Sequence, residues 1–400
     1  MRSRFPIVEL GKHVRQVSQR NRAEANIEVF SVTNSEGFTR STDYFSKEVF
    51  SKDVSNYKVV SPGQFAYNPS RINVGSIDYL RHGSSVLVSP LYIVFEGDND
   101  IYADYLLRYL KSDWGNSQIR ANTEGAVRDS LKFKGLENIK LPLPSLGDQI
   151  RIAHLLGKVE GLIAQRKQHL QQLDDLLKSV FLEMFGFRDQ TYTKWTIDAL
   201  EVYTGIVSGV TKGKKYNSKD LIEVPYMRVA NVQDGHFVLD EIKTIFVTQK
   251  EVDQYLLLSG DLLLTEGGDP DKLGRGSVWK NQIENCIHQN HIFRVRINEH
   301  LKINPYYLSA LIGSRYGKSY FLKSAKQTTG IASINSTQLK KFPVIIPPIE
   351  LQNQFATIVE KVENLKSRYQ ESLTDLESLY GALSQQVFKG ELDLSRVPLD

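Results

Sequence analysis

The sequence predicts an α+β protein, with two mixed, strand-rich globular domains joined by two long antiparallel coiled-coil helices in a pseudo-two-fold repeat. The first observation behind this prediction is an internal repeat, because residues 352–389 match, at a constant offset, the part of the stretch 141–186 that begins at Gln149. Gln149 falls on Gln352, and Lys158–Val159–Glu160 falls on Lys361–Val362–Glu363. The second observation is that a strand-rich segment with many turn residues precedes each copy.

Each copy of the repeat has the pattern of a long helix. Apolar residues recur at alternating steps of three and four, which is the spacing of a seam between paired helices. Prolines introduce both copies and neither has an internal one, and about 38 residues would give a helix of roughly 57 Å. Since neither copy has another seam of matching length, we expect the two helices to pack antiparallel against each other. The expected seam positions are Ile152, Leu155, Val159, Leu162, Leu173, Leu176, Val180 and Met184, then Phe355, Ile358, Val362, Leu365, Tyr369, Leu376, Leu379, Leu383 and Val387.

The two remaining segments share one order of elements. Short β-rich runs come first, then one helix, then a polar loop. In the first segment these are strands at 28–32, 57–60, 63–67, 85–89 and 92–95, a helix near 102–112 and a loop at 120–128. In the second they are strands at 224–230, 236–239, 261–265 and 291–296, a helix at 305–313 and a loop at 326–335. We therefore expect domains at 1–141 and 187–346, spacer helices at 142–186 and 347–392, and a tail at 393–400.

Composition indicates an unexported, soluble protein of the cytoplasm. No run of eighteen apolar residues occurs, no hydrophobic signal core follows the N-terminus, and Cys286 is the single cysteine. The globular segments carry the positive charge: residues 1–141 hold 19 Lys and Arg against 16 Asp and Glu, and residues 187–341 hold 21 against 16. The helical segments hold 5 against 5 and 5 against 9. A polyanion would therefore bind the globular parts, with the helices as a frame.

Several phrases of the chain, in their doubled order, resemble one family. They are VPYMRVANVQDG (224–235), LLLSGDLLLTEGGDPDKLGRGSVW (256–279), CIHQNHIFRVR (286–296) and TTGIASINSTQLKKFPVIIPP (328–348), with looser counterparts at 57–77 and 84–97. Together with the duplicated helix they are similar to the DNA-specificity subunit of type I restriction-modification enzymes, over essentially the whole chain. The resemblance implies two target-recognition domains that read the two halves of a bipartite, asymmetric DNA sequence.

The same resemblance implies the partners and the role of the helices. The partners would be double-stranded DNA, two adenine methyltransferase (modification) subunits and, for cleavage, restriction and translocase subunits, with no membrane involved. The paired helices would fix the gap between the half-sites and dock the methyltransferase subunits. Lengthening a helix by one heptad would then change the length of the gap and leave the two half-site sequences unchanged.

Candidate DNA-binding residues lie in polar loops that combine Arg or Lys with Asn, Gln, Ser and Thr. Arg and Lys hold phosphates or guanine edges, and Asn or Gln pairs with adenine. In the first domain we expect contacts from Asn68, Arg71, Asn73, Arg120, Asn122, Arg128 and Lys132. In the second we expect them from Lys212, Lys214, Lys215, Asn231, Lys272, Arg275, Lys326, Gln327, Thr328 and Ser333.

No catalytic, metal or cofactor site is expected. The carboxylates and lysine of 266–272 share one glycine-rich turn, whereas nucleases place them on adjacent strands. Cys286, His288 and His291 lack a fourth metal ligand at proper spacing. Asn68-Pro69-Ser70 lacks the second proline and the aromatic residue of a methyltransferase motif, and no glycine-rich strand–loop–helix precedes it. The alternatives to a non-catalytic recognition subunit are a fused DNA-modifying enzyme and a coiled-coil scaffold that binds only proteins.

Overall fold

The protein consists of two units, each with its own hydrophobic core. The computed structural model describes residues 3–22, 27–41, 53–124, 130–216, 220–269, 273–298, 300, 302–328 and 331–398, with residues 326–328 and 331 described by their backbone. Unit 1 comprises Met1–Lys167 and Glu371–Asp400, and unit 2 comprises Gln168–Gln370. Each unit therefore contains one globular part and one half of each long helix.

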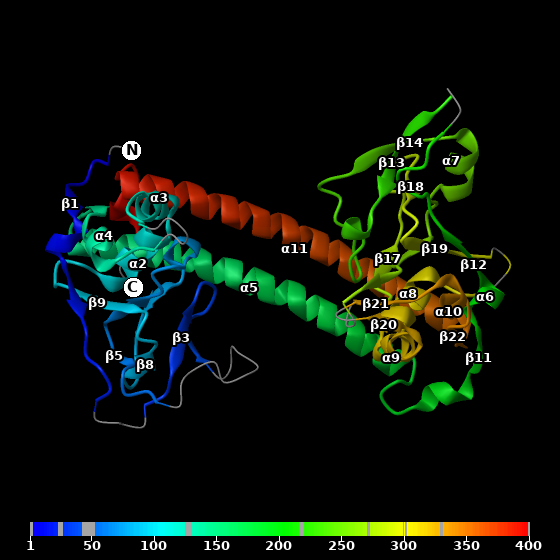
Figure 1. Ribbon diagram of the computed structural model, residues 1–400, viewed down its shortest axis with the longest axis horizontal. Helices are drawn as coiled ribbons and strands as arrows, with labels where there is room; N and C mark the ends of the chain where they lie inside the picture. The colour runs from blue at the N-terminus through cyan, green and yellow to red at the C-terminus, as the bar shows by residue number, and fades with distance from the viewer. Residues whose placement is uncertain are drawn as a thin grey trace. The chain divides into compact units, whose positions relative to one another are not determined.

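Unit 1 is built on an antiparallel four-stranded sheet covered by short helices (Figure 1). The sheet order is β2 (Val14–Val17), β9 (Ile93–Gly97), β6 (Phe65–Tyr67) and β7 (Ile77–Tyr79). Three strand pairs accompany it: β1 (Ile7–Glu9) with β10 (Lys140–Pro142), β3 (Phe30–Thr33) with β4 (Gly37–Arg40), and β5 (Lys58–Val60) with β8 (Val86–Val88). Its short helices are α2 (Ala103–Lys111), α3 (Asp113–Ala121) and α4 (Phe133–Glu137), with 3-10 turns η1 (Leu10–Lys12), η2 (Ile72–Val74) and η6 (Leu394–Arg396).

Unit 2 repeats this scaffold and adds two sheets. Its four-stranded sheet has the order β12 (Thr204–Ser208), β19 (Ile292–Ile297), β15 (Leu262–Thr265) and β17 (Gly276–Val278), and β11 (Thr196–Ala199) pairs with β22 (Pro343–Ile346). The added sheets are β14 (Lys243–Val247), β13 (Ile222–Met227) and β18 (Ile287–His288), and β16 (Gly267–Gly268), β21 (Ile331–Ser333) and β20 (Lys326–Thr328). The short helices are α6 (Leu200–Tyr203), α7 (Gln249–Tyr255), α8 (Pro305–Gly313), α9 (Arg315–Ser324) and α10 (Ser336–Lys340), with 3-10 turns η3 (Thr191–Lys194) and η4 (Val229–Asn231).

The structure confirms the two long helices. Helix α5 (Leu146–Met184) has 39 residues and α11 (Ile349–Lys389) has 41. In unit 1, Tyr380 donates to Glu160 at 2.7 Å and Lys167 pairs with Glu377 at 2.9 Å. In unit 2, the rings of His169 and Tyr369 lie 5.7 Å apart and Lys366 pairs with Asp174 at 2.5 Å. Residue numbers rise along α5 while those of their partners fall along α11, so the helices are antiparallel in each unit.

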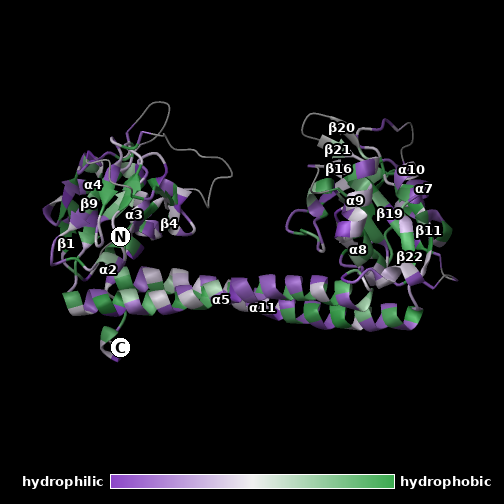
Figure 2. Cartoon of the chain, turned by 90° about the horizontal axis from the view of Figure 1, so that it is seen from below, coloured by the Kyte–Doolittle hydropathy of each residue, from purple (hydrophilic) through white to green (hydrophobic). Residues whose placement is uncertain are grey.

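The apolar seam is shorter than the sequence predicts. Four expected seam residues are exposed: Leu162 (49%), Leu176 (47%), Leu365 (41%) and Leu379 (47%). The middle of the pair is instead held by the ionic and polar contacts given above, and Figure 2 shows that hydrophilic residues predominate there. Buried apolar contacts are concentrated at the helix ends, where the globular parts pack on them. The prediction was wrong at these four leucines because periodicity alone does not tell a buried stripe from its neighbour.

A buried glutamine at the start of each long helix fastens that helix to its globular part. Gln149 is 1% exposed; its Oε1 accepts from Tyr102 N at 2.9 Å, and its Nε2 donates to Asp100 O at 2.8 Å and Pro144 O at 3.1 Å. Gln352 is 0% exposed and makes the same three bonds in unit 2. Its partners are Asn304 N at 2.8 Å, Lys302 O at 3.4 Å and Pro347 O at 2.8 Å. In each unit, one side-chain amide thus bonds the backbone of two segments: the one that leads into α2 or α8, and the one that leads into the long helix.

An aromatic cluster packs the end of the other long helix into each core. In unit 1 the ring of Phe388, near the end of α11, lies 5.6 Å from Tyr105 and 5.3 Å from Tyr109. In unit 2 the ring of Phe185, just after α5, lies 4.5 Å from Tyr307. Phe185 and Phe388 are equivalent residues of the repeat, and both are fully buried. Each core therefore holds the start of one long helix and the end of the other.

The turn between the two helices that cover each sheet is also duplicated. Ser112 caps α3 by accepting from Gly115 N, and Ser314 caps α9 by accepting from Gly317 N. A Cβ on Gly115 would lie 2.0 Å from Tyr109 O, and a Cβ on Gly317 would lie 2.1 Å from Ile312 O. Only glycine fits these two positions without moving the backbone of the preceding helix.

Helix α7 begins with a capping box that also holds the loop before β13. Thr248 accepts from Glu251 N, and Glu251 accepts from Thr248 N at 3.1 Å and from Lys214 Nζ at 2.7 Å. Burial would by itself raise the pKa of Glu251, but these hydrogen bonds outweigh it and lower the pKa to about 2. The ionised carboxylate is therefore part of the folded structure.

Two short predictions were wrong. Residues 236–239 are not a strand, since among the described residues only Phe237 forms a bridge there, with Val232. The loop expected at 326–335 contains strands β20 and β21, which pair with each other as a local hairpin, and β16, which is distant in sequence, pairs with β21.

We predict that Gln352→Leu lowers the free energy of unfolding of unit 2 by about 1–3 kcal/mol. The substitution leaves the backbone N–H of Asn304 and the backbone carbonyl of Pro347 buried without their hydrogen-bond partner. The measurement is urea unfolding of the full chain. Gln354→Leu, at an exposed position of the same helix turn, is the control and should change the transition little. Equal transitions for the two variants would show that the amide is dispensable.

We also predict that the stability supplied by Glu251 depends on acid pH. Its pKa is lower in the folded protein than the ordinary value of 4.5 for a glutamate side chain, so its contribution is complete above about pH 4.5 and is lost as the pH falls toward 2. Glu251→Gln should remove this part of the pH dependence, measured by urea unfolding across that range. Glu201→Gln, at an exposed site, should keep the wild-type profile; an unchanged profile in Glu251→Gln would contradict the assignment.

Candidate nucleic-acid interface

In unit 1, the connection between β6 and β7 carries three of the expected DNA-binding residues. Asn68 accepts from Ser70 N at 3.1 Å and shapes the turn, while Arg71 is exposed. The carbonyl of Asn73 accepts from Asn116 of α3 at 3.1 Å. Leu131 N donates to Pro69 O at 3.0 Å. The connection therefore lies against both α3 and the segment that leads into α4.

The other expected residues of unit 1 lie on these neighbouring segments. Arg120 is exposed in the last turn of α3, and Asn122, which follows the helix, donates to Gln118 O at 2.9 Å. Lys132 is exposed and pairs with Glu124 at 3.0 Å. Arg128 lies outside the described residues. The fold thus gathers Arg71, Arg120 and Lys132 around one connection, with amide side chains between them.

In unit 2, the equivalent connection runs from β15 to β17 and is joined by the hairpin of β20 and β21. Ile334 N donates to Glu266 O at 2.9 Å, and β16 pairs with β21 next to Ser333, which is half-buried. Arg275 is half-buried and donates to Gln233 at 3.2 Å. The backbone of 326–328 forms β20 in this sheet; the side chains of Lys326, Gln327 and Thr328, and all of Lys272, lie outside the description.

The remaining expected residues of unit 2 differ in what they can offer a ligand. Lys212 and Lys215 are exposed in the loop after β12, and Lys214 beside them is paired with Glu251. Asn231 is only 3% exposed, and its Nδ2 donates to the carbonyls of Val238 at 2.8 Å and Glu241 at 3.1 Å. Its Oδ1 accepts from Arg228 N at 3.0 Å. The amide of Asn231 therefore stabilises its own loop and is not free to reach a base edge.

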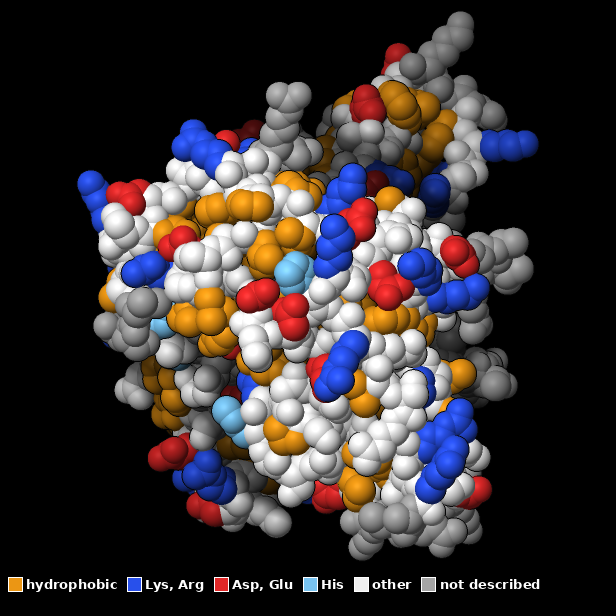
Figure 3. All heavy atoms as spheres, turned by 90° about the vertical axis from the view of Figure 1, so that its left-hand side faces the viewer, with side chains coloured by type: hydrophobic (Ala, Val, Ile, Leu, Met, Phe, Trp, Pro, Cys, Tyr) orange, Lys and Arg blue, Asp and Glu red, His pale blue; other side chains and the backbone are white. Residues whose placement is uncertain are grey.

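Charge is not concentrated into one patch on the face of unit 1 drawn in Figure 3. Lys and Arg side chains are scattered there among Asp and Glu side chains. A groove lined by one sign of charge would attract DNA at long range, and this face offers no such groove.

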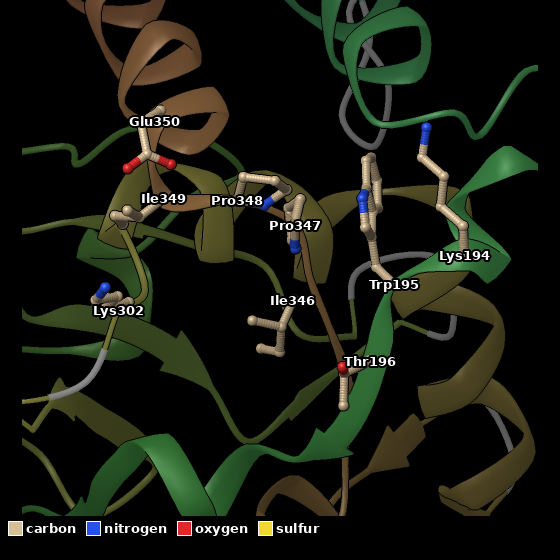
Figure 4. Close-up of a pocket in the computed structure, with 9 residues that line it drawn as sticks. All are labelled: Lys194, Trp195, Thr196, Lys302, Ile346, Pro347, Pro348, Ile349 and Glu350. Carbon is tan, nitrogen blue, oxygen red and sulfur yellow. The ribbon is translucent and has the colours of Figure 1, made fainter.

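A cavity of about 420 Å³ lies in unit 2 at the start of α11 (Figure 4). Trp195 and the pair Pro347–Pro348 line it, and Lys194 and Lys302 stand at opposite sides. Among its described lining residues, Thr196 carries the one hydroxyl group and Glu350 the one carboxylate. Figure 4 shows these two side chains at opposite ends of the cavity, so the described lining does not bring a nucleophile and a base together.

The cysteine and histidines singled out in the sequence are held by ordinary contacts. Cys286 is buried, and burial raises the pKa of its thiol to about 12. Both ring nitrogens of His288 lie within 3.2 Å of carbonyl oxygens, of Tyr255 and Val207, and burial lowers its pKa to about 4. His291 is bonded to Glu266 at 2.7 Å. None of the three belongs to a described group of possible metal ligands.

One such group was missed by the sequence analysis. His13, Asp98 and Asp100 of unit 1 place possible ligand atoms within 4.8 Å of one another, and His13 Nδ1 lies 3.0 Å from Asp98. The pairing of β2 with β9 brings them together. A local spacing rule cannot find residues so distant in sequence.

Comparison with known proteins agrees with this architecture. A family model described as the type I restriction modification DNA specificity domain matches residues 62–174 and 205–375. The StySPI specificity subunit of a type I restriction enzyme from Salmonella potsdam is 24% identical over 311 residues, which cover 73% of this chain. The match spans 66% of that subunit, just under two thirds of its length. Among the helices of the described residues, none has the length and apolar character that a bilayer span requires.

Two solved structures show the same fold. One, from work on complex assembly and conformational transition of the type I R-M system, has a TM-score of 0.55 at 16% identity and covers 97% of this chain and 98% of its own. The other, a type I restriction-modification S subunit from M. genitalium, has a TM-score of 0.54 at 13% identity and covers 96% of both chains. With the family model matching two separate segments, the chain belongs to the family of type I restriction modification DNA specificity domains.

Proposed function

We propose that this chain is the non-catalytic DNA-recognition subunit of a type I restriction-modification complex. Residues 1–141 and 187–346 would each read one half of a bipartite, asymmetric target. Residues 142–186 and 347–392 would fix the gap between the halves, and 393–400 would be a tail. Catalysis would come from adenine methyltransferase subunits and, for cleavage, from restriction subunits.

One observation carries this proposal: the two units share a scaffold but differ in the loops mounted on it. The glutamine bonds, the buried Phe–Tyr contact and the Ser–Gly turn are the same in both. The equivalent sheet connections differ. In unit 1 the connection is a 3-10 turn that includes Asn73, and in unit 2 it joins a three-stranded sheet. A protein that recognises two different half-site sequences requires two similar scaffolds that carry different DNA-contacting loops.

The exposed cations of the loops would hold the DNA backbone. Arg71, Arg120 and Lys132 in unit 1, and Lys212 and Lys215 in unit 2, are exposed. Each can neutralise a phosphate and release counterions, so affinity should fall steeply with salt. Amide and hydroxyl groups between the cations would contact base edges. Asn231 is left out of this set, because its amide is bonded within its loop.

The exposed leucines of the long helices would dock the methyltransferase subunits. In unit 1, Leu162 and Leu379 lie at one level of the helix pair, since Glu160 contacts Tyr380 and Lys167 contacts Glu377. In unit 2, Leu176 and Leu365 lie beside the Asp174–Lys366 pair. The two leucine pairs are equivalent in the repeat, so two copies of one partner would fit. The recurrence of the same exposed pair in both units is what favours two contacts with one kind of partner.

We predict that adenine methylation in a genome expressing this chain with its methyltransferase follows a bipartite motif with a fixed gap. The double variant Arg71→Ala/Arg120→Ala should lower methylation at every occurrence of the motif without changing the motif, because both cations are proposed to hold phosphates and phosphate contacts carry no base information. Sequencing that maps methylated adenines is the measurement. Lys12→Ala, at an exposed lysine of η1, is the control and should leave methylation unchanged. A continuous palindrome, or a changed motif in the double variant, would contradict the proposal.

We further predict that Leu162→Glu/Leu379→Glu abolishes co-purification of one methyltransferase copy, because a carboxylate would have to be buried in the contact. The mass of the complex, measured by light scattering, should decrease by one methyltransferase subunit. Gln165→Glu, at an exposed position of the same helix, should leave the mass unchanged. A complex of wild-type mass in the double leucine variant would place the docking surface elsewhere.

A further inference from the structure

A second cleft of unit 2 lies on the face of the four-stranded sheet where β12 meets β19. It measures about 390 Å³ and is lined by Gly205 and Val207 of β12, by Arg294 and Arg296 of β19, and by His300. The register pairs Gly205 with Arg296 and Val207 with Arg294. Since alternate residues of a strand share a face, the two guanidinium groups lie side by side on the same surface.

Among the described residues, the carboxylate of Asp261 is the one that acts on both cations. Arg296 binds Asp261 through Nε and Nη2, each at 2.7 Å from one carboxylate oxygen. Asp261 Oδ2 also accepts from Leu258 N at 2.7 Å. The hydrogen bonds of this carboxylate therefore go to Arg296 and to the backbone, and Asp261 acts on Arg294 through space without a direct ion pair.

Arg294 is buried but incompletely satisfied. It is 7% exposed, and its Nη1 donates to the carbonyls of Gln254 at 3.0 Å and Leu256 at 2.9 Å. Its Nε is buried without a hydrogen-bond partner, and among the described residues no carboxylate pairs with it. Burial and the neighbouring Arg296 lower the pKa of Arg294 by more than the Asp261 carboxylate raises it. A buried cation that is incompletely compensated in this way is stabilised when an anion binds beside it.

We propose that this cleft is a binding site for a phosphate group, held by Arg294 with Arg296 and His300 at the rim. The cleft is larger than a phosphate ion, so it has room both for free phosphate and for a phosphate group of a DNA strand. The proposal does not rest on the function proposed above.

Unit 1 provides an internal reference, because its equivalent surface has the opposite character. Strand β9 pairs with β2 through Gly97 and Val14, as β19 pairs with β12 through Ile297 and Thr204. This register puts Val94 at the place of Arg294 and Glu96 at the place of Arg296. Glu96 forms an ion pair with Arg15. The anion site therefore belongs to unit 2 and is not a property of the shared scaffold.

Gly205 allows the cleft to be closed without disturbing Arg294. A Cβ at this position meets no atom within 4 Å, so a larger side chain can enter the cleft. Gly205→Leu should fill it with apolar atoms. Gly205→Asp should place a carboxylate near the two arginines and supply a direct ion-pair partner from within the chain.

The experiment is thermal unfolding of the full chain in inorganic phosphate, compared with chloride at the same ionic strength. The wild type should unfold at a temperature that rises with phosphate concentration. Gly205→Leu should lose this shift. Gly205→Asp should unfold at a higher temperature without phosphate and respond no further. Ser208→Leu, at an exposed position of the same strand, should respond like the wild type.

Two results would overturn the proposal: no shift of the wild type beyond that in chloride, or an equal shift in Gly205→Leu. Binding of a duplex oligonucleotide then separates the two phosphate sources. If the DNA backbone supplies the phosphate, Gly205→Leu should weaken duplex binding by about tenfold, as expected for loss of one charge-assisted contact. If the phosphate is free, duplex binding should match that of Ser208→Leu.

Discussion

The fold depends on a buried side-chain amide at the first turn of each long helix. Gln149 and Gln352 each satisfy one backbone N–H and two carbonyls that the adjoining segments leave unpaired. A buried backbone group without a partner costs as much as a lost hydrogen bond, so the helix cannot move away from its globular part without exposing all three groups. The contact is polar and directional, and it therefore fixes how the helix leaves the globular part as well as where it begins.

The other contacts of the scaffold build on this connection. Once the helix start is held, the end of the other helix can insert Phe388 or Phe185 among the tyrosines of the same core. The middle of the pair then needs only polar contacts, such as Lys167 with Glu377 and Lys366 with Asp174. Exposed ion pairs contribute little stability, so the globular cores supply most of what holds the helices together.

The sequence predicted the architecture well because the internal repeat and the helical spacing of apolar residues extend over many residues of the chain. It placed α5, α11, α2 and α8 nearly as observed, since prolines and apolar spacing mark them. It failed at Leu162, Leu176, Leu365 and Leu379, because apolar spacing does not show which stripe of a helix is buried. It also missed strands β20 and β21, whose residues are mostly polar or small and whose sheet is completed by the distant strand β16.

The candidate site was harder to predict for the same reason. Arg71 and Arg120 are exposed, as the polar composition of their loops indicated. Loop composition could not show that the side-chain amide of Asn231 is hydrogen-bonded within its own loop. Nor could it show that His13 meets Asp98, or that Arg294 faces a cleft beside an occupied carboxylate. Such facts depend on strand register, which short patterns do not encode.

The paired Ser–Gly turns have a consequence for how such chains can diverge. At Gly115 and Gly317 any side chain would collide with a carbonyl oxygen, so drift is blocked at these positions, whereas the exposed loop positions carry no such restriction. In this chain the two turns therefore limit which residues the scaffold accepts. The exposed loops can change in sequence, and hence in what they bind, without a change of fold.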